Sequence, residues 1–462
     1  PPVVTPTRAG GFDQKIAIIG AGPAGLSCAF YLAEKGYKPV VFEKNERPGG
    51  MLTYGIPSFK LEKDVIEAEV EIIRLMGAEF RYGVEVGRDV TLDELREQGF
   101  KAFYVAIGCQ GGRLAGIPGE DAEDVTVAVD FLREVNSGKI DSLSGRTIVV
   151  GGGNVAIDVA RNACRLGSEH VEMFCLESEA QMPASEEERR EAVEDGAHIS
   201  CGWGPKEIHL DEAGRVCGIT FKRCTRVFDD EGRFAPEYDE NDLRRVDADR
   251  VVMSIGQSIV WGDLLAGSKV ELGRGQGALA DPQTYQTAEP DIFVGGDVYT
   301  GPSFAIDAIA AGHEAAVSIH RFVQPGSTLT IGRNQRHYTA LDRDDVVIES
   351  YDNASREVAH VDREREKAAP FSEYVETFTE EQVRAETARC LGCGASVVDP
   401  NKCIGCGICT TRCAFDAIHL HRDLPECSTM RSAEDKMKGI LPYMIKRKIR
   451  IRRAKKAEKR NG

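Results

Sequence analysis

Two glycine-rich turns, each flanked by short apolar runs, limit this chain to a narrow set of folds. Residues 15–44 read KIAIIGAGPAGLSCAFYLAEKGYKPVVFEK, and residues 146–177 read RTIVVGGGNVAIDVARNACRLGSEHVEMFCLE. Each stretch predicts a strand, a tight turn, a helix and a second strand. The β-branched runs suit strands of a parallel sheet that is covered on both faces. The repeat therefore predicts an α/β chain with two Rossmann-like domains.

The first turn carries the spacing of a dinucleotide site, Gly20-x-Gly22-x-x-Gly25. Glycines at these positions allow the tight bend and a close backbone approach, and the N-terminus of the following helix binds a pyrophosphate. Glu43 ends the second expected strand, where a carboxylate accepts hydrogen bonds from ribose hydroxyls. The alternative interpretation is a strand-to-helix turn that binds no ligand.

The second turn has the spacing Gly151-x-Gly153-x-x-Ala156, an accepted variant of the same pattern. The strand that follows is expected to end at Glu177, whose carboxylate would repel a 2′-phosphate. Residues 174–182 (FCLESEAQM) contain no basic side chain that would bind one. The sequence therefore favours NADH over NADPH, the alternative being a solvated glutamate without influence on specificity.

A third element, DIFVGGD at 291–297, precedes Gly301-Pro302-Ser303 and an expected helix through Ala305–His320. It offers a carboxylate at the end of a strand and a helix N-terminus whose partial positive charge would stabilise an anionic reduced flavin. The alternative is an ordinary turn between a strand and a helix.

The cysteines are concentrated near the C-terminus. Of 14 cysteines, half lie within a short segment: Cys390, Cys393, Cys403, Cys406, Cys409, Cys413 and Cys427. The run C-x2-C-x2-C-x3-C from 403 to 413 is the bacterial ferredoxin spacing for a [4Fe–4S] cluster. Zinc sites normally pair their cysteines differently. Seven cysteines cannot supply the eight ligands of two clusters. Two clusters, which we favour, therefore need one ligand of another kind. A single cluster would leave some of the seven thiols unused.

The remaining cysteines are expected to be structural. Cys28, Cys109 and Cys164 lie in apolar contexts and are expected to be core thiols. No C-x-x-C occurs in residues 1–389, which argues against a flavin-coupled disulfide reductase.

Charge and hydropathy exclude several classes of function. The net charge of −16 argues against nucleic-acid or membrane-surface binding. No apolar run approaches the roughly 20 residues of a membrane helix. We see no signal peptide, and we expect a cytoplasmic protein. The charge is unevenly distributed along the chain. Residues 436–462 contain 12 Lys/Arg and one Glu, a net charge of +11, so the rest of the chain has a net charge of −27. This tail is either a solvated end or a docking segment for an acidic partner subunit.

The chain resembles the small (beta) subunit family of glutamate synthase over about residues 15–321. The resemblance rests on GAGPAGL (20–26), RPGGMLTYGIPSFKL (47–61), IPGED (117–121), GGGNVAID (151–158), MPA (182–184), SIGQ (254–257) and FVGGDVYTGPSFAIDAIAAGHEAA (293–316). It departs from that family in lacking an upstream cysteine-rich region, and in having Leu176 and Glu177 where the family carries an arginine pair. These departures favour relatives that carry a C-terminal ferredoxin module and feed electrons into larger complexes.

The turns and the resemblance together define the expected sites. The resemblance implies FAD in the first domain, held by Gly20, Gly22, Pro23, Ala24, Gly25, Glu43, Lys44, Gly50, Met51, Gly108, Gly296, Asp297, Ser303 and Ala305. The nicotinamide nucleotide is expected at Gly151, Gly153, Asn154, Val155, Ala156 and Glu177. The expected organisation is a linker (1–13), an FAD domain (14–118 and 257–325) interrupted by an NAD(H) domain (119–256), a charged connector (326–385), a small ferredoxin-like domain (386–428) and the basic tail (429–462). Within the connector, Thr379 is expected to cap a helix from Glu380 to about Arg389.

The predicted function is electron transfer by a subunit of a larger redox complex, whether or not that complex bifurcates electrons. A hydride passes from NADH to FAD, and single electrons leave through the clusters to partner redox subunits, ferredoxin being one candidate. The direction is open to reversal. The alternative is a non-catalytic wiring subunit whose nucleotide domain binds no NAD(P)H.

Overall fold

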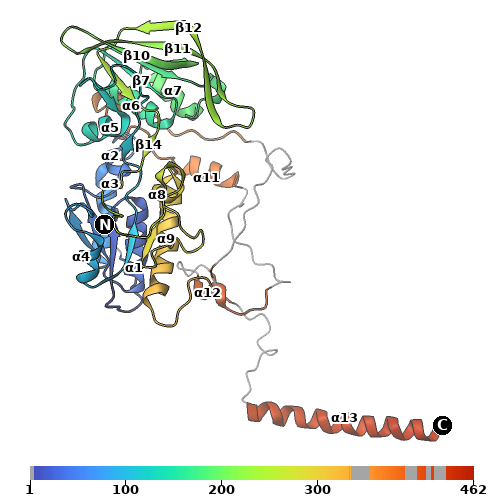
Figure 1. The fold of residues 1–462 in the computed structure, drawn as a ribbon. Helices are drawn as coiled ribbons and strands as arrows, with labels where there is room; N and C mark the ends of the chain where they lie inside the picture. Colours follow the sequence, from blue (N-terminus) through green and yellow to red (C-terminus); the bar gives the residue numbers. More distant parts are fainter. Residues whose placement is uncertain are drawn as a thin grey trace. The chain divides into compact units, whose positions relative to one another are not determined.

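The computed structural model describes residues 5–331, 333, 354–390, 403–412, 418–420 and 433–461. The chain separates into two compact units, Pro1–Val383 and Arg384–Gly462. The first unit contains all the sheets of the described residues and is shown in Figure 1, where several of its elements are labelled.

The first α/β domain is built on a five-stranded parallel sheet. Its strands follow the order β15 (Ile292–Val294), β4 (Phe100–Val105), β1 (Lys15–Ile19), β2 (Val40–Glu43) and β3 (Glu79–Tyr82). Ile16 and Ile18 of β1 enter one apolar cluster, whereas Ala17 and Ile19 enter the cluster on the opposite face. Both faces are therefore buried, as the apolar runs predict.

Helices surround this sheet, and two of them approach each other closely at a glycine. The helices are α1 (Pro23–Lys35), α2 (Met51–Tyr54), α3 (Lys63–Leu75), α4 (Leu92–Glu97), α8 (Asp297–Thr300) and α9 (Ala305–Val323). A Cβ added to Gly312 of α9 would lie 2.3 Å from the carbonyl oxygen of Ala24 in α1. The residues expected as a linker also pack here, since Arg8 donates to the carbonyls of Gly36 and Tyr37.

The second α/β domain has a parallel sheet of the same kind. Its strand order is β6 (Val125–Val127), β13 (Arg250–Met253), β7 (Arg146–Val150), β8 (His170–Cys175) and β9 (His198–Cys201). Its helices are α5 (Ala128–Asn136), α6 (Asn154–Arg165) and α7 (Glu186–Glu194). Because β15 returns to the first sheet after the second has been completed, the predicted interruption of one domain by the other is confirmed.

An antiparallel sheet, which the sequence analysis does not predict, covers one face of the second parallel sheet. It consists of β10 (Trp203–Leu210), β11 (Val216–Phe228) and β12 (Phe234–Val246). Phe221 of this sheet stacks on Phe174 of β8 with ring centroids 3.9 Å apart. A short pair, β5 (Gly111–Gly112) with β14 (Gln257–Ser258), lies where the chain enters and leaves the second domain.

Residues 360–376, which we call the strap, lie within the expected charged connector and pack on the second domain. The strap contains α10 (Arg363–Ala368) and closes on itself through a bridge between Val361 and Val375. Phe371 packs against the apolar cluster around α6. The phenol of Tyr374 accepts a hydrogen bond from the buried guanidinium of Arg161 at 2.6 Å.

The C-terminal elements are helical where they are described. The predicted helix α11 (Glu380–Ala388) is confirmed with its cap, since the Thr379 hydroxyl accepts from the Gln382 N–H at 3.3 Å. Helix α12 (Ile408–Arg412) follows the first cysteines of the ferredoxin-type run. The basic tail forms α13 (Ala433–Asn461), with Pro442 inside the helix.

Candidate functional site

The first glycine-rich turn is forced by backbone contacts. Gly20 has φ +103°, and a Cβ there would lie 2.5 Å from the carbonyl oxygen of Ala106. A Cβ on Gly25 would lie 1.9 Å from the carbonyl oxygen of Gly20. Gly22 is the N-cap of α1 and brings no side chain to the helix end. The first amides of α1 are therefore left for an anionic ligand, as a pyrophosphate site requires.

A second backbone segment faces this turn. Gly50 has φ +55°, and a Cβ there would approach the Cα of Gly22 to 2.9 Å. Gly296 has φ +67°, and its Cβ would lie 3.0 Å from the Cβ of Ala24. Three separate stretches of the chain thus leave a cradle that added side chains would fill, so the residues present fit a dinucleotide such as FAD.

Glu43 is buried at the end of β2 and anchors the same cradle. Its carboxylate accepts from the Ala21 N–H at 2.8 Å and from the Asn45 N–H and side-chain amide at 2.9 and 2.7 Å. A carboxylate has about four lone-pair directions, which leaves room for a ribose hydroxyl. Asn45 was not identified from the sequence, because it lies beyond the strand-end position that the fingerprint marks.

Asp297 begins α8, two glycines after the end of β15. Burial raises the pKa of its carboxyl group, although hydrogen bonding opposes the shift. Cys109 lies against its backbone carbonyl, with Sγ 3.7 Å from that oxygen. Cys109 and Cys28 are buried, as expected of core thiols, whereas Cys164 is only partly buried. Burial also raises the pKa of Cys109 to about 12.

The second turn is equally tight. Gly151 has φ +143°, and a Cβ there would lie 2.2 Å from the carbonyl oxygen of Ser254. A Cβ on Gly152 would lie 3.0 Å from the Glu177 carboxylate, so this carboxylate lies against the turn. The strand β8 ends at Cys175, two residues earlier than the sequence analysis expects, and Glu177 lies on the loop after it.

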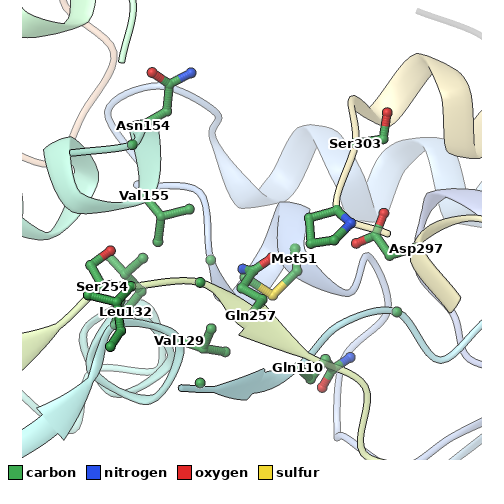
Figure 2. A pocket seen from close by; sticks show the side chains of 18 of the residues that line it. Met51, Gln110, Val129, Leu132, Asn154, Val155, Ser254, Gln257, Asp297 and Ser303 are labelled. Carbon is green, nitrogen blue, oxygen red and sulfur yellow. The ribbon is translucent and has the colours of Figure 1, made fainter. Parts of the chain in front are cut away.

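Both turns open into one cavity of about 1230 Å³ within the first unit. This volume exceeds the roughly 300–1,000 Å³ of a typical small-molecule pocket. All the nucleotide-site residues expected from the sequence line it except Gly25 and Ala156, which pack behind the turns. Figure 2 shows Met51 and Gln257 lying between Asn154 and Val155 on one side and Asp297 and Ser303 on the other. The two glycine-rich turns therefore face one continuous space.

An ion bridge that the sequence analysis does not identify ties the two domains together at this cavity. The Nζ of Lys60 lies 2.6 Å from Oδ1 of Asp158 in α6, and it also contacts the carboxylate of Glu188. Burial raises the pKa of Asp158 to about 6, while Lys60 opposes the shift. Both Lys60 and Asp158 fall inside motifs that carry the family resemblance, but the sequence does not show that they meet.

Lys63 supports the short helix that presents Met51. Its Nζ donates to the carbonyl of Leu52 at 2.9 Å and to the carbonyl of Ile56. Burial, with a further contribution from Arg47, lowers the pKa of Lys63 to about 8.

This depressed pKa predicts a pH-dependent stability. The unfolded chain, with a lysine pKa of about 10.4, binds more protons than the folded chain between about pH 8 and 10.4, so this group makes folding more favourable as the pH rises. The free energy of unfolding in urea should therefore be measured for wild type and for Lys63→Met. The wild-type value minus the variant value should rise between pH 8 and 10. The exposed Lys139→Met is the control, and a Lys63→Met difference that stays constant with pH would contradict the assignment.

The cysteine-rich segment is described only in part. Cys390, Cys403, Cys406 and Cys409 are exposed thiols, whereas Cys393, Cys413 and Cys427 lie outside the described residues. Gly405 and Gly407, on either side of Cys406, have φ +66° and +77°. Within the described part of the chain, no three ligand-type side chains gather at one point. The donor chemistry of the 403–413 run nevertheless fits an iron–sulfur cluster, because thiolates are the ligands such clusters use.

Comparison with known proteins agrees with this picture. Residues 14–312 match the model for pyridine nucleotide-disulphide oxidoreductases, and residues 396–419 match a 4Fe-4S binding domain. The match to the second model supports the predicted cluster.

Three curated relatives show the range of the family. The chain is 36% identical to the NADP(+)-dependent formate dehydrogenase subunit beta of Moorella thermoacetica, covering 82% of this chain and 54% of that protein. It is 37% identical to the glutamate synthase [NADPH] small chain of Escherichia coli K12, covering 67% and 69%. It is 33% identical to the PreT subunit of NAD-dependent dihydropyrimidine dehydrogenase of E. coli O157:H7, covering 67% and 68%. The chain thus spans about half the length of the formate dehydrogenase relative.

A solved structure shows the same fold. Mycobacterium tuberculosis FprA in complex with NADPH superposes with a TM-score of 0.58 at 20% identity, covering 67% of this chain and 84% of that one. Among the described residues, no helix is both long and apolar enough to cross a membrane. From the site geometry, the matched family model and the relatives, the chain belongs to the pyridine nucleotide-disulphide oxidoreductase family, in the branch that includes the glutamate synthase small chain, with a 4Fe-4S binding domain near its C-terminus.

Proposed function

We propose that this chain is an electron-transfer subunit that takes electrons from NADH and delivers them, through one or two [4Fe–4S] clusters, to a partner redox subunit. The observation that carries the proposal is the single cavity lined by both dinucleotide turns. FAD, when bound, supplies the conversion between a two-electron hydride donor and single-electron carriers. The residues of the first turn, with Glu43 and Asp297, would hold it, and the residues of the second turn would hold the nicotinamide nucleotide.

Several observations support a partner-dependent role. The relatives from M. thermoacetica and E. coli O157:H7 are themselves named as subunits. The described residues before Cys390 hold no paired C-x-x-C thiols for disulfide chemistry. We expect the basic helix α13 to contribute to docking on an acidic partner. Two clusters remain our proposal, with seven cysteines and one ligand of another kind.

An anaerobic titration tests the nucleotide step. Adding NADH to the flavin-loaded chain should bleach the flavin absorbance at near-stoichiometric nucleotide. If neither NADH nor NADPH bleaches it, the chain is a non-catalytic wiring subunit and the proposal is wrong.

The NADH preference is proposed to rest on Glu177. Its carboxylate lies against the second turn, where it would repel a 2′-phosphate, and the relatives include both NADP- and NAD-dependent proteins. Glu177→Gln should raise the ratio of kcat/KM for NADPH to that for NADH by roughly 10- to 150-fold, since one charged contact is worth about 1.5–3 kcal/mol. The control is Glu179→Gln, an exposed carboxylate on the same loop that does not line the cavity. A wild-type protein that already prefers NADPH would refute this assignment.

A further inference from the structure

The antiparallel sheet β10–β12 forms a wall of the cavity that the dinucleotide turns do not account for. Six of its side chains line the cavity: Trp203, Pro205, Lys222, Phe234, Pro236 and Tyr238. Flat aromatic rings and proline faces are suited to contact with a base, since aromatic stacking is sequence-tolerant and needs only a π-face. Lys222 is the one cation among the six.

This wall adjoins the loop that carries Glu177. The Gly202 N–H donates to the backbone carbonyl of Glu177 at 2.9 Å. A Cβ on Gly204 would lie 2.4 Å from the ring of Tyr238 and 2.9 Å from the side chain of Leu176. Gly204 therefore lies between Tyr238 and Leu176, the residue before Glu177. A larger residue at position 204 would have to displace one of these two side chains.

Lys222 is held at this end of the cavity by two contacts. Its Nζ lies 4.1 Å from the centroid of the Tyr238 ring, within the range of a cation–π interaction. It also donates to the Glu240 carboxylate at 2.7 Å. Glu240 is shared, because Lys206 approaches its other oxygen at 3.3 Å. These two lysines lower the pKa of Glu240, so the carboxylate stays charged at neutral pH.

We propose that Lys222 is a second determinant of nucleotide specificity, acting on the ribose 2′ substituent from the wall that adjoins the Glu177 loop. Glu177 disfavours a 2′-phosphate, Lys222 favours it, and Glu240 weakens Lys222 by competing for its charge. Lysine binds phosphate as a point charge, without the geometry of an arginine pair. This inference rests on the proposed binding of a nicotinamide nucleotide at the second turn, and it predicts that the chain binds NADPH measurably although residues 174–182 contain no basic side chain.

Calorimetric titration of the full-length, cofactor-loaded chain with NAD+ and with NADP+ tests the proposal without turnover. Lys222→Met should weaken NADP+ binding by about tenfold and change the Kd for NAD+ by less than about twofold. Lys222→Arg should retain the wild-type ratio of the two Kd values, and Glu240→Gln should tighten NADP+ binding. Lys139→Met is the control, because Lys139 is exposed and does not line the cavity.

The outcomes separate this inference from the function on which it rests. If both nucleotides bind and Lys222→Met leaves their Kd ratio at the wild-type value, Lys222 has no role in specificity and only this inference is overturned. If Lys222→Met weakens the binding of both nucleotides equally, the Lys222 side chain stabilises the wall and does not act on the 2′ group. That result also overturns this inference. If neither nucleotide binds the wild-type chain, the proposed function fails together with the inference.

Discussion

Gly25→Ala is expected to yield a protein that retains less than about a tenth of its FAD. The added Cβ would lie 1.9 Å from the carbonyl oxygen of Gly20 and 3.3 Å from Cγ2 of Ile18, and the nearer of these atoms is backbone that cannot rotate away. The turn must open, which moves the first amides of α1 away from the pyrophosphate position. The flavin-to-protein ratio, measured by absorbance after denaturation, checks the result.

The matched control for this variant lies in the second turn. Gly153 has no heavy atom within 4 Å of an added Cβ and an ordinary φ of −90°, so Gly153→Ala should keep its full flavin content. A Gly25→Ala protein purified with stoichiometric FAD would show that the turn tolerates a side chain and would contradict the geometry.

Arg161→Ala is expected to cost about 3–5 kcal/mol of unfolding free energy, as is usual when one partner of a buried ion pair is removed. The guanidinium is 1% exposed, lies 2.7 Å from Asp195, contacts Glu191 and donates to the phenol of Tyr374 at 2.6 Å. Its removal leaves the carboxylates of Asp195 and Glu191 with less compensation and removes one of the hydrogen bonds between α6 and the strap.

Urea unfolding followed by tryptophan fluorescence measures this loss. Arg190→Ala is the control, since this arginine is 63% exposed and its ion pairs are 3.8 and 3.9 Å long, so a change below about 1 kcal/mol is expected. A loss below 1 kcal/mol for Arg161→Ala as well would mean that the strap contributes little to the second domain.

The glycine turns could be predicted from sequence because their determinants are local. Gly20, Gly22 and Gly25 lie in one turn, and the strands that flank them are recognisable from their own apolar residues. The same holds for the Thr379 cap, whose hydrogen bond reaches only three residues along the chain. Strand and helix periodicity, together with the glycine turns, therefore suffices to predict two α/β domains with parallel sheets, but not the antiparallel sheet β10–β12.

The contacts that complete the site join residues far apart in the sequence. Lys60 and Asp158 are separated by 98 positions, and Arg161 and Tyr374 by 213. The strap appears in the sequence only as a charge-rich stretch, because it buries few apolar side chains: Tyr374 is buried and Phe371 is partly buried. Lys222 reaches the cavity through strand pairing in β10–β12 that carries no fingerprint, so its role beside Glu177 follows only from the fold.

Rapid anaerobic mixing of the chain with NADH, followed by flavin absorbance and by freeze-quench electron paramagnetic resonance of the clusters, tests the central claim most directly. The flavin band should be lost first, the cluster signals should appear no faster than this loss, and protein stripped of flavin should show no cluster reduction by NADH. A flavin that remains oxidised in the presence of both NADH and NADPH, or clusters that NADH reduces equally fast without flavin, would contradict the claim.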